Sequence, residues 1–182
     1  MSTRLITTDT RIKYLVSNPL LFNLPYPVSS RVSSTLDNSL GKSCLVDGNP
    51  ETCWTSQQAR ITSQSLPLHL TSSPQGLPQY IHLAFSSPVI PGRISLTFQG
   101  GFVGTACVVT TRSQDAASWQ ELTRIYPEDV NRAQVFDLTA GEPVKAIKLI
   151  FEESSDFFGR ITVYNLMIEG QIWSDESEGT RN

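Results

Sequence analysis

The chain contains little cysteine and little histidine, and it has no long apolar run. Among its 182 residues are three cysteines and two histidines. Cys44, Cys53 and Cys107 cannot all pair within one chain, so the sequence favours a reducing compartment over a disulfide framework. No apolar run is long enough to cross a bilayer, and the residues near Met1 lack the apolar core of a secretory signal. We therefore expect an intracellular protein.

The chain also lacks an excess of positive charge. It has 14 Lys and Arg residues and 17 Asp and Glu residues, which gives a formal net charge of -3 and a pI of about 5.4. Such a balance offers no general attraction to phosphate backbones or to anionic lipid. We therefore expect neither nucleic acid nor a membrane surface to be a direct partner.

Motifs that would indicate an enzyme are absent. His69 and His82 are the only histidines, and neither stands in an H-E-x-x-H or Cys/His metal spacing, so we expect surface or hydrogen-bonded residues. There is no G-x-S-x-G, G-x-x-x-x-G-K-[ST] or G-x-G-x-x-G motif, and DFFG at 156–159 lacks the other motifs of a kinase. The sequence predicts a protein that is not an enzyme and requires no cofactor.

What the chain does have is a series of short segments in which every second residue is apolar. Gly, Pro, Asp and Ser separate these segments, as turn residues do. The predicted strands are 79–85, 93–100, 106–113, 119–126, 133–139, 146–153 and 161–170. No longer stretch has the period of a helix. We therefore predict an all-β fold, an antiparallel β-sandwich or jelly roll whose connecting loops carry the binding sites.

Composition divides the chain into three parts. Residues 1–26 are predicted to form a partly ordered N-terminal extension, and residues 27–173 the sandwich. The acidic tail 174–182 offers no apolar side chain to anchor it and is predicted to be disordered. Within the sandwich, residues 60–78 are rich in Ser, Thr and Pro and predict an inserted surface loop.

Three motifs resemble those of discoidin-like, or galactose-binding-like, domains. LVDGNPETCWTS at 45–56 is similar to a D-G-x-x-x-T-x-W loop of that superfamily. QYIHLAF at 79–85 is similar to its W-I-x-I-D-L strand, and TTRSQDAASWQEL at 110–122 to its S-x-D-G-x-x-W motif. The resemblance implies the same β-sandwich.

Further motifs narrow the resemblance to the small nuclear-receptor-associated proteins named for partnership with testicular orphan receptors. They are SRVSSTL (30–36), ETCWTSQQ (51–58), FQGGF (98–102), IYPEDVN (125–131) and FEESSDFFGRITVYNLMIEG (151–170). This resemblance implies a protein-binding adaptor of the nucleus or cytoplasm, with an orphan nuclear receptor as partner and a corepressor-like role. Similar sandwiches occur in intraflagellar transport and in a large ubiquitin ligase, so a structural subunit stays open. A glycan-binding module is a further alternative, although we expect a protein partner.

The loop at 45–56 is a candidate calcium site. Asp47, Asn49 and Thr52 offer the oxygen ligands that calcium prefers. In carbohydrate-binding domains that this chain resembles, the loop holds a structural calcium completed by a Glu of the last strand. The matching residue here is Asn165, which removes a charge. The alternative is an Asx-type turn in which Asp47 accepts backbone N–H groups and Gly48 adopts a positive φ.

Two Phe-containing loops form the candidate partner-binding surface. In FQGGF, Gly100 and Gly101 are expected to adopt positive φ between two exposed Phe residues. Aromatic and Arg side chains at loop tips are typical of protein interfaces. The predicted contact residues are Phe102, Trp119, Tyr126, Phe157, Phe158 and Arg160. The alternative is that these Phe residues cap the core while Arg160 pairs with Asp156 or Glu153. Trp54 is expected in the core.

Overall fold

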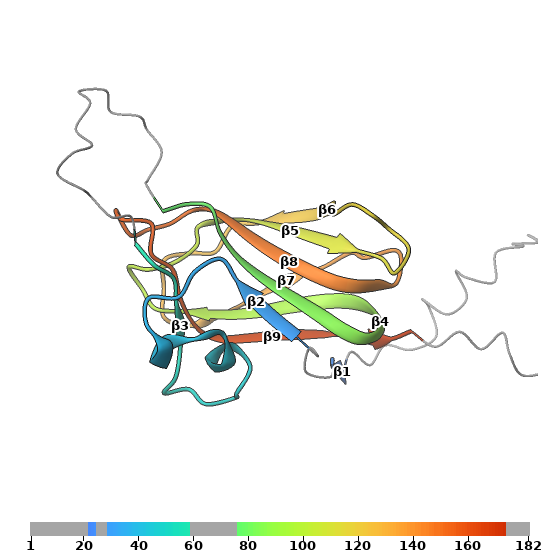
Figure 1. Cartoon of the computed structure of the whole chain (residues 1–182), viewed down its shortest axis with the longest axis horizontal. Coiled ribbons are helices and arrows are strands. Elements are labelled where there is room, and N and C mark those ends of the chain that lie inside the picture. Colours follow the sequence, from blue (N-terminus) through green and yellow to red (C-terminus); the bar gives the residue numbers. More distant parts are fainter. Residues whose placement is uncertain (1–21, 25–28, 59–75, 174–182) are drawn as a thin grey trace, which may run out of the picture.

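The computed structural model describes residues 22–24, 29–58 and 76–173, which form a layered β-structure with two short 3-10 helices (Figure 1). The strands are β1 Phe22–Asn23, β2 Ser29–Val32, β3 Trp54–Thr55, β4 Gln79–Phe98, β5 Ala106–Arg112, β6 Gln120–Ile125, β7 Ala133–Asp137, β8 Val144–Glu153 and β9 Thr162–Ile172. The helices are η1 Asn38–Leu40 and η2 Lys42–Leu45. All the strand pairs are antiparallel, so the predicted all-β class is confirmed.

Strand β4 connects the two layers. Its first half pairs with β8 on one side and with β2 on the other. The first layer therefore has the strand order β2-β4-β8-β5-β6. Its second half pairs with β9 and β7, and β9 also pairs with the short strands β1 and β3. The pairing with β8 shifts register between Ala84 and Val89, where the strand passes from one layer to the other.

The separate strands predicted at 79–85 and 93–100 are therefore one strand, and that division was wrong. The Ser-Ser-Pro sequence at 86–88 was interpreted as a turn, but it falls within the interval where β4 lacks a regular partner on β8. Proline is tolerated in a strand at such an irregularity because no ladder hydrogen bond is required from it there.

The core lies between the layers and comes from the inward-facing residues of the long strands. Ile94, Leu96 and Phe98 of β4 are fully buried, and the Phe98 ring meets Phe151 of β8 edge to face at 6.0 Å. Phe98 continues the inward alternation of β4 up to the last residue of the strand. The expectation that it is an exposed residue of FQGGF was wrong.

Trp54 closes the core beside β9. Its side chain has 0% relative exposure, and its Nε1–H donates a hydrogen bond of 3.0 Å to the carbonyl oxygen of Ser34. Burial of a large ring with its polar atom satisfied is the usual condition of a core Trp. The predicted core position of Trp54 is confirmed.

Several predicted segments fall on residues that the structure does not describe. Of the predicted extension 1–26, residues 22–24 are described, and Phe22–Asn23 pairs with β9. Of the predicted loop 60–78, only residues 76–78 are described, and the predicted tail 174–182 lies outside. Among the described residues, no helix has the length and apolar character needed to span a membrane.

Candidate functional site

The loops that follow β4, β6 and β8 are joined by hydrogen bonds at one end of the sandwich. The backbone N–H of Ser155 donates to the carbonyl oxygen of Val103 at 2.9 Å, which links the loops after β8 and β4. The N–H of Gly101 donates to Oδ1 of Asp129 at 2.6 Å, which links the loops after β4 and β6. We call residues 99–105, 126–132 and 154–161 the three-loop end.

Within the three-loop end, Arg160 is held from several sides. Its N–H donates to Oδ2 of Asp156 at 3.0 Å, and its Nε pairs with the same oxygen at 3.4 Å. The hydroxyl of Ser154 donates to the carbonyl oxygen of Arg160 at 2.6 Å. The guanidinium carbon lies 4.4 Å from the centre of the Phe102 ring. The loop is therefore ordered by its own side chains, and a partner would meet a fixed shape.

Phe157 is the most exposed large apolar side chain of this loop. Its relative exposure is 83%, and its ring meets that of half-buried Phe158 edge to face at 5.2 Å. Tyr126, directly after β6, has 66% exposure. Phe157 therefore does not cap the core, contrary to the alternative interpretation of this loop. The ion pair between Arg160 and Asp156, which that interpretation also expected, is present.

Two of the three glycines in these loops adopt a positive φ, and the third does not. Gly159 has a φ of +74° and Gly101 a φ of +83°, so both adopt the left-handed region that side chains disfavour. Gly100 is not among the positive-φ residues, and a Cβ there would lie 3.1 Å from Oδ1 of Asn131. The expectation of positive φ at Gly100 was wrong, because only one residue of this turn needs that conformation.

The structure divides the six predicted contact residues into two groups. Phe102, Tyr126, Phe157, Phe158 and Arg160 all belong to the three-loop end. Trp119 precedes β6, whereas Tyr126 follows it, so these two aromatics stand at opposite ends of that strand. Trp119 lies instead against His82, with 5.3 Å between ring centres, on the outer face of the β2-β4-β8-β5-β6 layer.

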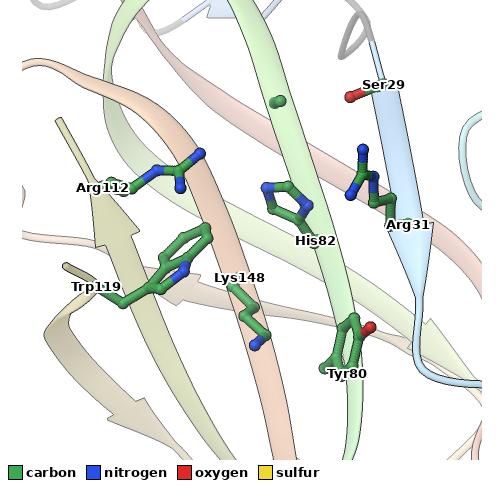
Figure 2. A pocket seen from close by; sticks show the side chains of 8 residues that line it. Ser29, Arg31, Tyr80, His82, Arg112, Trp119 and Lys148 are labelled. Atoms are coloured by element: carbon green, nitrogen blue, oxygen red, sulfur yellow. The ribbon is translucent and has the colours of Figure 1, made fainter. Parts of the chain in front are cut away.

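Around Trp119 the structure has a hollow that the sequence reasoning missed (Figure 2). Its volume is about 420 Å³. We call it the outer-face hollow. The residues that line it are Ser29, Arg31, Tyr80, His82, Ala84, Arg112, Trp119 and Lys148. Alternation along 79–85 does indicate that Tyr80 and His82 face outward, since Ile81 and Leu83 face inward. What the sequence does not indicate is which strands lie beside them.

His82 lies on the outer face, as expected of a surface histidine, but its side chain is half-buried. Its Nε2 is buried and has no hydrogen-bond partner within the described part of the chain. Burial lowers the pKa of His82, and the positive charges of Arg112, Arg31 and Lys148 lower it further. The neutral imidazole is therefore favoured at neutral pH.

The candidate calcium loop is closed by its own donors. Oδ1 of Asp47 accepts the N–H of Asn49 at 2.9 Å, and Oδ2 accepts the hydroxyl of Thr52 at 2.6 Å. Gly48 has a φ of +69°, as an Asx-type turn allows. The Thr52 hydroxyl and then the Asn49 N–H lower the pKa of Asp47.

A calcium ion would thus compete with the loop for both carboxylate oxygens. Asn165 lies on β9 opposite Thr97, and among the described residues no hydrogen bond joins it to Asp47, Asn49 or Thr52. No group of three His, Cys, Asp or Glu side chains in residues 22–24, 29–58 and 76–173 could hold a metal ion. These observations fit the Asx-type turn, and the calcium site stays a prediction.

The chain has the fold of a galactose-binding-like, discoidin-type β-sandwich. The chain is similar to chitosan-binding module 1 of a chitosanase/glucanase from Paenibacillus sp. IK-5, with a TM-score of 0.63 and 14% identity over 82% of this chain and 99% of that module. It is also similar to the family 32 carbohydrate-binding module of C. perfringens NanJ in complex with galactose, with a TM-score of 0.59 and 14% identity over 78% and 92% of the two chains. Likeness at this identity concerns the fold alone.

Sequence comparison identifies the family. The chain is 37% identical over 145 residues to the nuclear receptor 2C2-associated protein of Danio rerio, covering 78% of this chain and 90% of that protein. It is 34% identical over 146 residues to the protein of that name in Homo sapiens, covering 78% and 91% of the two chains. No family model matches the chain. The chain belongs to the nuclear receptor 2C2-associated protein family, and the predicted resemblance is confirmed.

Proposed function

We propose that this chain is a non-enzymatic adaptor of the nucleus or cytoplasm that binds a nuclear receptor through its three-loop end and acts in the manner of a corepressor. The names of its relatives state an association with nuclear receptor 2C2. The observation that carries the proposal is Phe157, an aromatic side chain with 83% exposure on a loop that is otherwise held by internal hydrogen bonds.

The three-loop end has the physical properties of a protein-binding surface. Burying an aromatic side chain against a partner removes apolar area from water, which contributes about 25 cal/mol per Å². Because Asp156 and Ser154 already order the loop, less conformational entropy is lost on binding than for a flexible segment. Arg160, stacked on Phe102, adds a charged group beside the apolar centre.

The direct test is the variant Phe157→Ala, with binding to purified nuclear receptor 2C2 measured by surface plasmon resonance. We expect affinity to fall by roughly tenfold or more, as at an interface hot spot, while the melting temperature stays unchanged because the ring lies outside the core. Val135→Ala is the matched control, since Val135 is also an exposed apolar residue but lies on β7. Equal affinity of Phe157→Ala and the wild type, or no binding by the wild type, would contradict the proposal.

The alternative classes lead to different observations. A glycan-binding module would bind on a glycan array and lose that binding in Trp119→Ala. Arg112, however, lies over the Trp119 ring at 5.0 Å from its centre, which leaves less of that ring for a sugar. A structural subunit of a ciliary or ubiquitin-ligase assembly would purify with many proteins rather than with one receptor.

A further inference from the structure

Six of the nine Lys and Arg side chains among the described residues are neutralised or hydrogen-bonded, and the other three gather in one place. Ion pairs with carboxylates engage Arg93, Arg124, Arg132 and Arg160. Lys42 and Lys145 donate hydrogen bonds to backbone carbonyl oxygens. The three that remain, Arg31, Arg112 and Lys148, have no carboxylate or hydrogen-bond partner within the described part of the chain, and all three line the outer-face hollow (Figure 2).

Strand register brings these residues together. Arg31 of β2 stands opposite His82 of β4, and His82 stands opposite Lys148 of β8, so the three form one cross-strand row. The adjacent row contains Ala84, opposite Ser29 and Ala146. Because the Ser29 and Ala84 side chains are short, the part of this row on β2 and β4 leaves space beside the row of longer side chains, while Arg112 of β5 stands opposite Ala146 further along the row. The hollow is therefore a consequence of register and side-chain size.

Aromatic rings position two of the cations without removing their charge. The guanidinium of Arg112 lies 5.0 Å from the centre of the Trp119 ring, and the Nζ of Lys148 lies 4.5 Å from the centre of the Tyr80 ring. A cation on a ring face keeps its full charge and its N–H donors. Arg112 and Lys148 can therefore still bind an anion.

The carboxylates that share this sheet face are already neutralised. Glu152 of β8 pairs with Arg124 at 2.9 Å, and Glu121 of β6 pairs with the same guanidinium at 3.1 Å. Neither carboxylate lines the hollow. Figure 2 shows His82 between Arg31 on one side and Arg112, Trp119 and Lys148 on the other. Its buried Nε2 is a further polar atom without a partner within the described residues.

We propose that the outer-face hollow is a second docking site, separate from the three-loop end, and that it binds an acidic segment of a partner protein. Glu or Asp carboxylates of that segment would contact Arg31, Arg112 and Lys148. Charge complementarity carries this assignment. The net charge of -3 opposes a long polyanion such as nucleic acid, and three cations around 420 Å³ match a few carboxylates.

The first test is calorimetric titration of the full chain with a synthetic peptide of alternating Glu and Ser at low ionic strength. A peptide with Gln in place of Glu is the neutral control. We expect the wild type to bind the Glu peptide and not the Gln peptide. The affinity for the Glu peptide should fall at least roughly tenfold in Lys148→Gln and in Arg112→Gln. Arg132→Gln is the matched variant, because Arg132 is an exposed arginine that pairs with Glu128 away from the hollow, and it should bind as the wild type does.

The second test observes His82 by NMR during the same titration, with the far-UV spectrum of each variant confirming its fold. Bound carboxylates would offset the repulsion from Arg112, Arg31 and Lys148, so the pKa of His82 should rise with the Glu peptide and stay unchanged with the Gln peptide.

Four outcomes would overturn the proposal. The first two are no binding of the Glu peptide and equal binding of the Glu and Gln peptides. The third is tighter binding of a single-stranded oligonucleotide of the same charge, which would make the hollow a nucleic-acid surface. The fourth is unchanged affinity in both hollow variants, which would place the peptide elsewhere. None of these outcomes depends on receptor binding by Phe157.

Discussion

At the scale of single residues, aspartate side chains hold the loops of this protein in shape. Asp37 accepts the N–H of Ser39 at 2.7 Å, Asp47 accepts that of Asn49, and Asp156 accepts that of Arg160. The short Asp side chain can accept a hydrogen bond from a backbone N–H a few residues later in the chain. Such a bond replaces one that a helix or sheet would supply. The candidate recognition loop and the candidate calcium loop thus rest on the same local chemistry.

The hydrogen bonds to Asp47 predict a specific dependence on pH. The Thr52 hydroxyl and the Asn49 N–H favour the carboxylate, so the pKa of Asp47 is lower in the folded protein than in the unfolded chain. A lowered pKa means that Asp47 stabilises the fold above its unfolded pKa and that this contribution is lost as pH falls through the folded pKa. We expect Thr52→Val to return the pKa of Asp47 toward 3.8, observed by NMR titration of the carboxyl carbon. An unchanged pKa in that variant would show that Thr52 is not the main cause.

At the scale of elements, the close approach of β4 and β9 determines where the chain tolerates a side chain. Gly170 of β9 stands opposite Pro91 of β4. A Cβ on Gly170 would lie 2.3 Å from the carbonyl oxygen of Ile90 and 3.0 Å from Cα of Pro91, both backbone atoms. Backbone atoms within a paired strand cannot move without disturbing the ladder. The φ of Gly170 is not positive, so backbone conformation does not require glycine here. The close packing of the two strands does.

We expect Gly170→Ala to lower the free energy of unfolding by about 1–3 kcal/mol, because it overpacks two paired strands. Gly141→Ala is the control, since a Cβ at that position meets nothing within 4 Å. Urea denaturation followed by intrinsic fluorescence, to which Trp54, Trp119 and Trp173 all contribute, measures both variants. Equal midpoints for the two variants would mean that β4 and β9 can separate at little cost.

At the scale of the whole molecule, the two layers close around an apolar core with no disulfide among the described cysteines. Cys44 and Cys107 are buried and Cys53 is half-buried, all as free thiols. Burial raises the pKa of the Cys107 thiol well above its usual range, so this side chain behaves as a small apolar residue. The core continues from Leu45 and Trp54 to Ile161 and Val163, so the candidate calcium loop borders a closed hydrophobic cluster.

This arrangement predicts that folding does not require calcium. We expect the melting temperature to be the same in excess chelator and in millimolar calcium, because the loop donors already occupy both oxygens of Asp47. Calorimetric titration of metal-free protein should likewise release no heat. A calcium-dependent rise in melting temperature that is lost in Asp47→Asn would instead establish the metal site at Asp47, Asn49, Thr52 and Asn165.

The sequence by itself determined the all-β class, the inward side chains of the long strands and the family. Neighbouring side chains in a strand point to opposite faces, so a local pattern is sufficient to separate Ile81 and Leu83 from Tyr80 and His82. Strands as short as β2 and β3 contain too few residues for such a pattern, and the sequence did not reveal them.

Only the tertiary structure decided which outward residues share a site. Arg31, His82 and Lys148 come from strands far apart in sequence, and their alignment depends on the register of β2, β4 and β8. Register is set by how the buried faces fit one another across the sheet, and no local pattern encodes that fit.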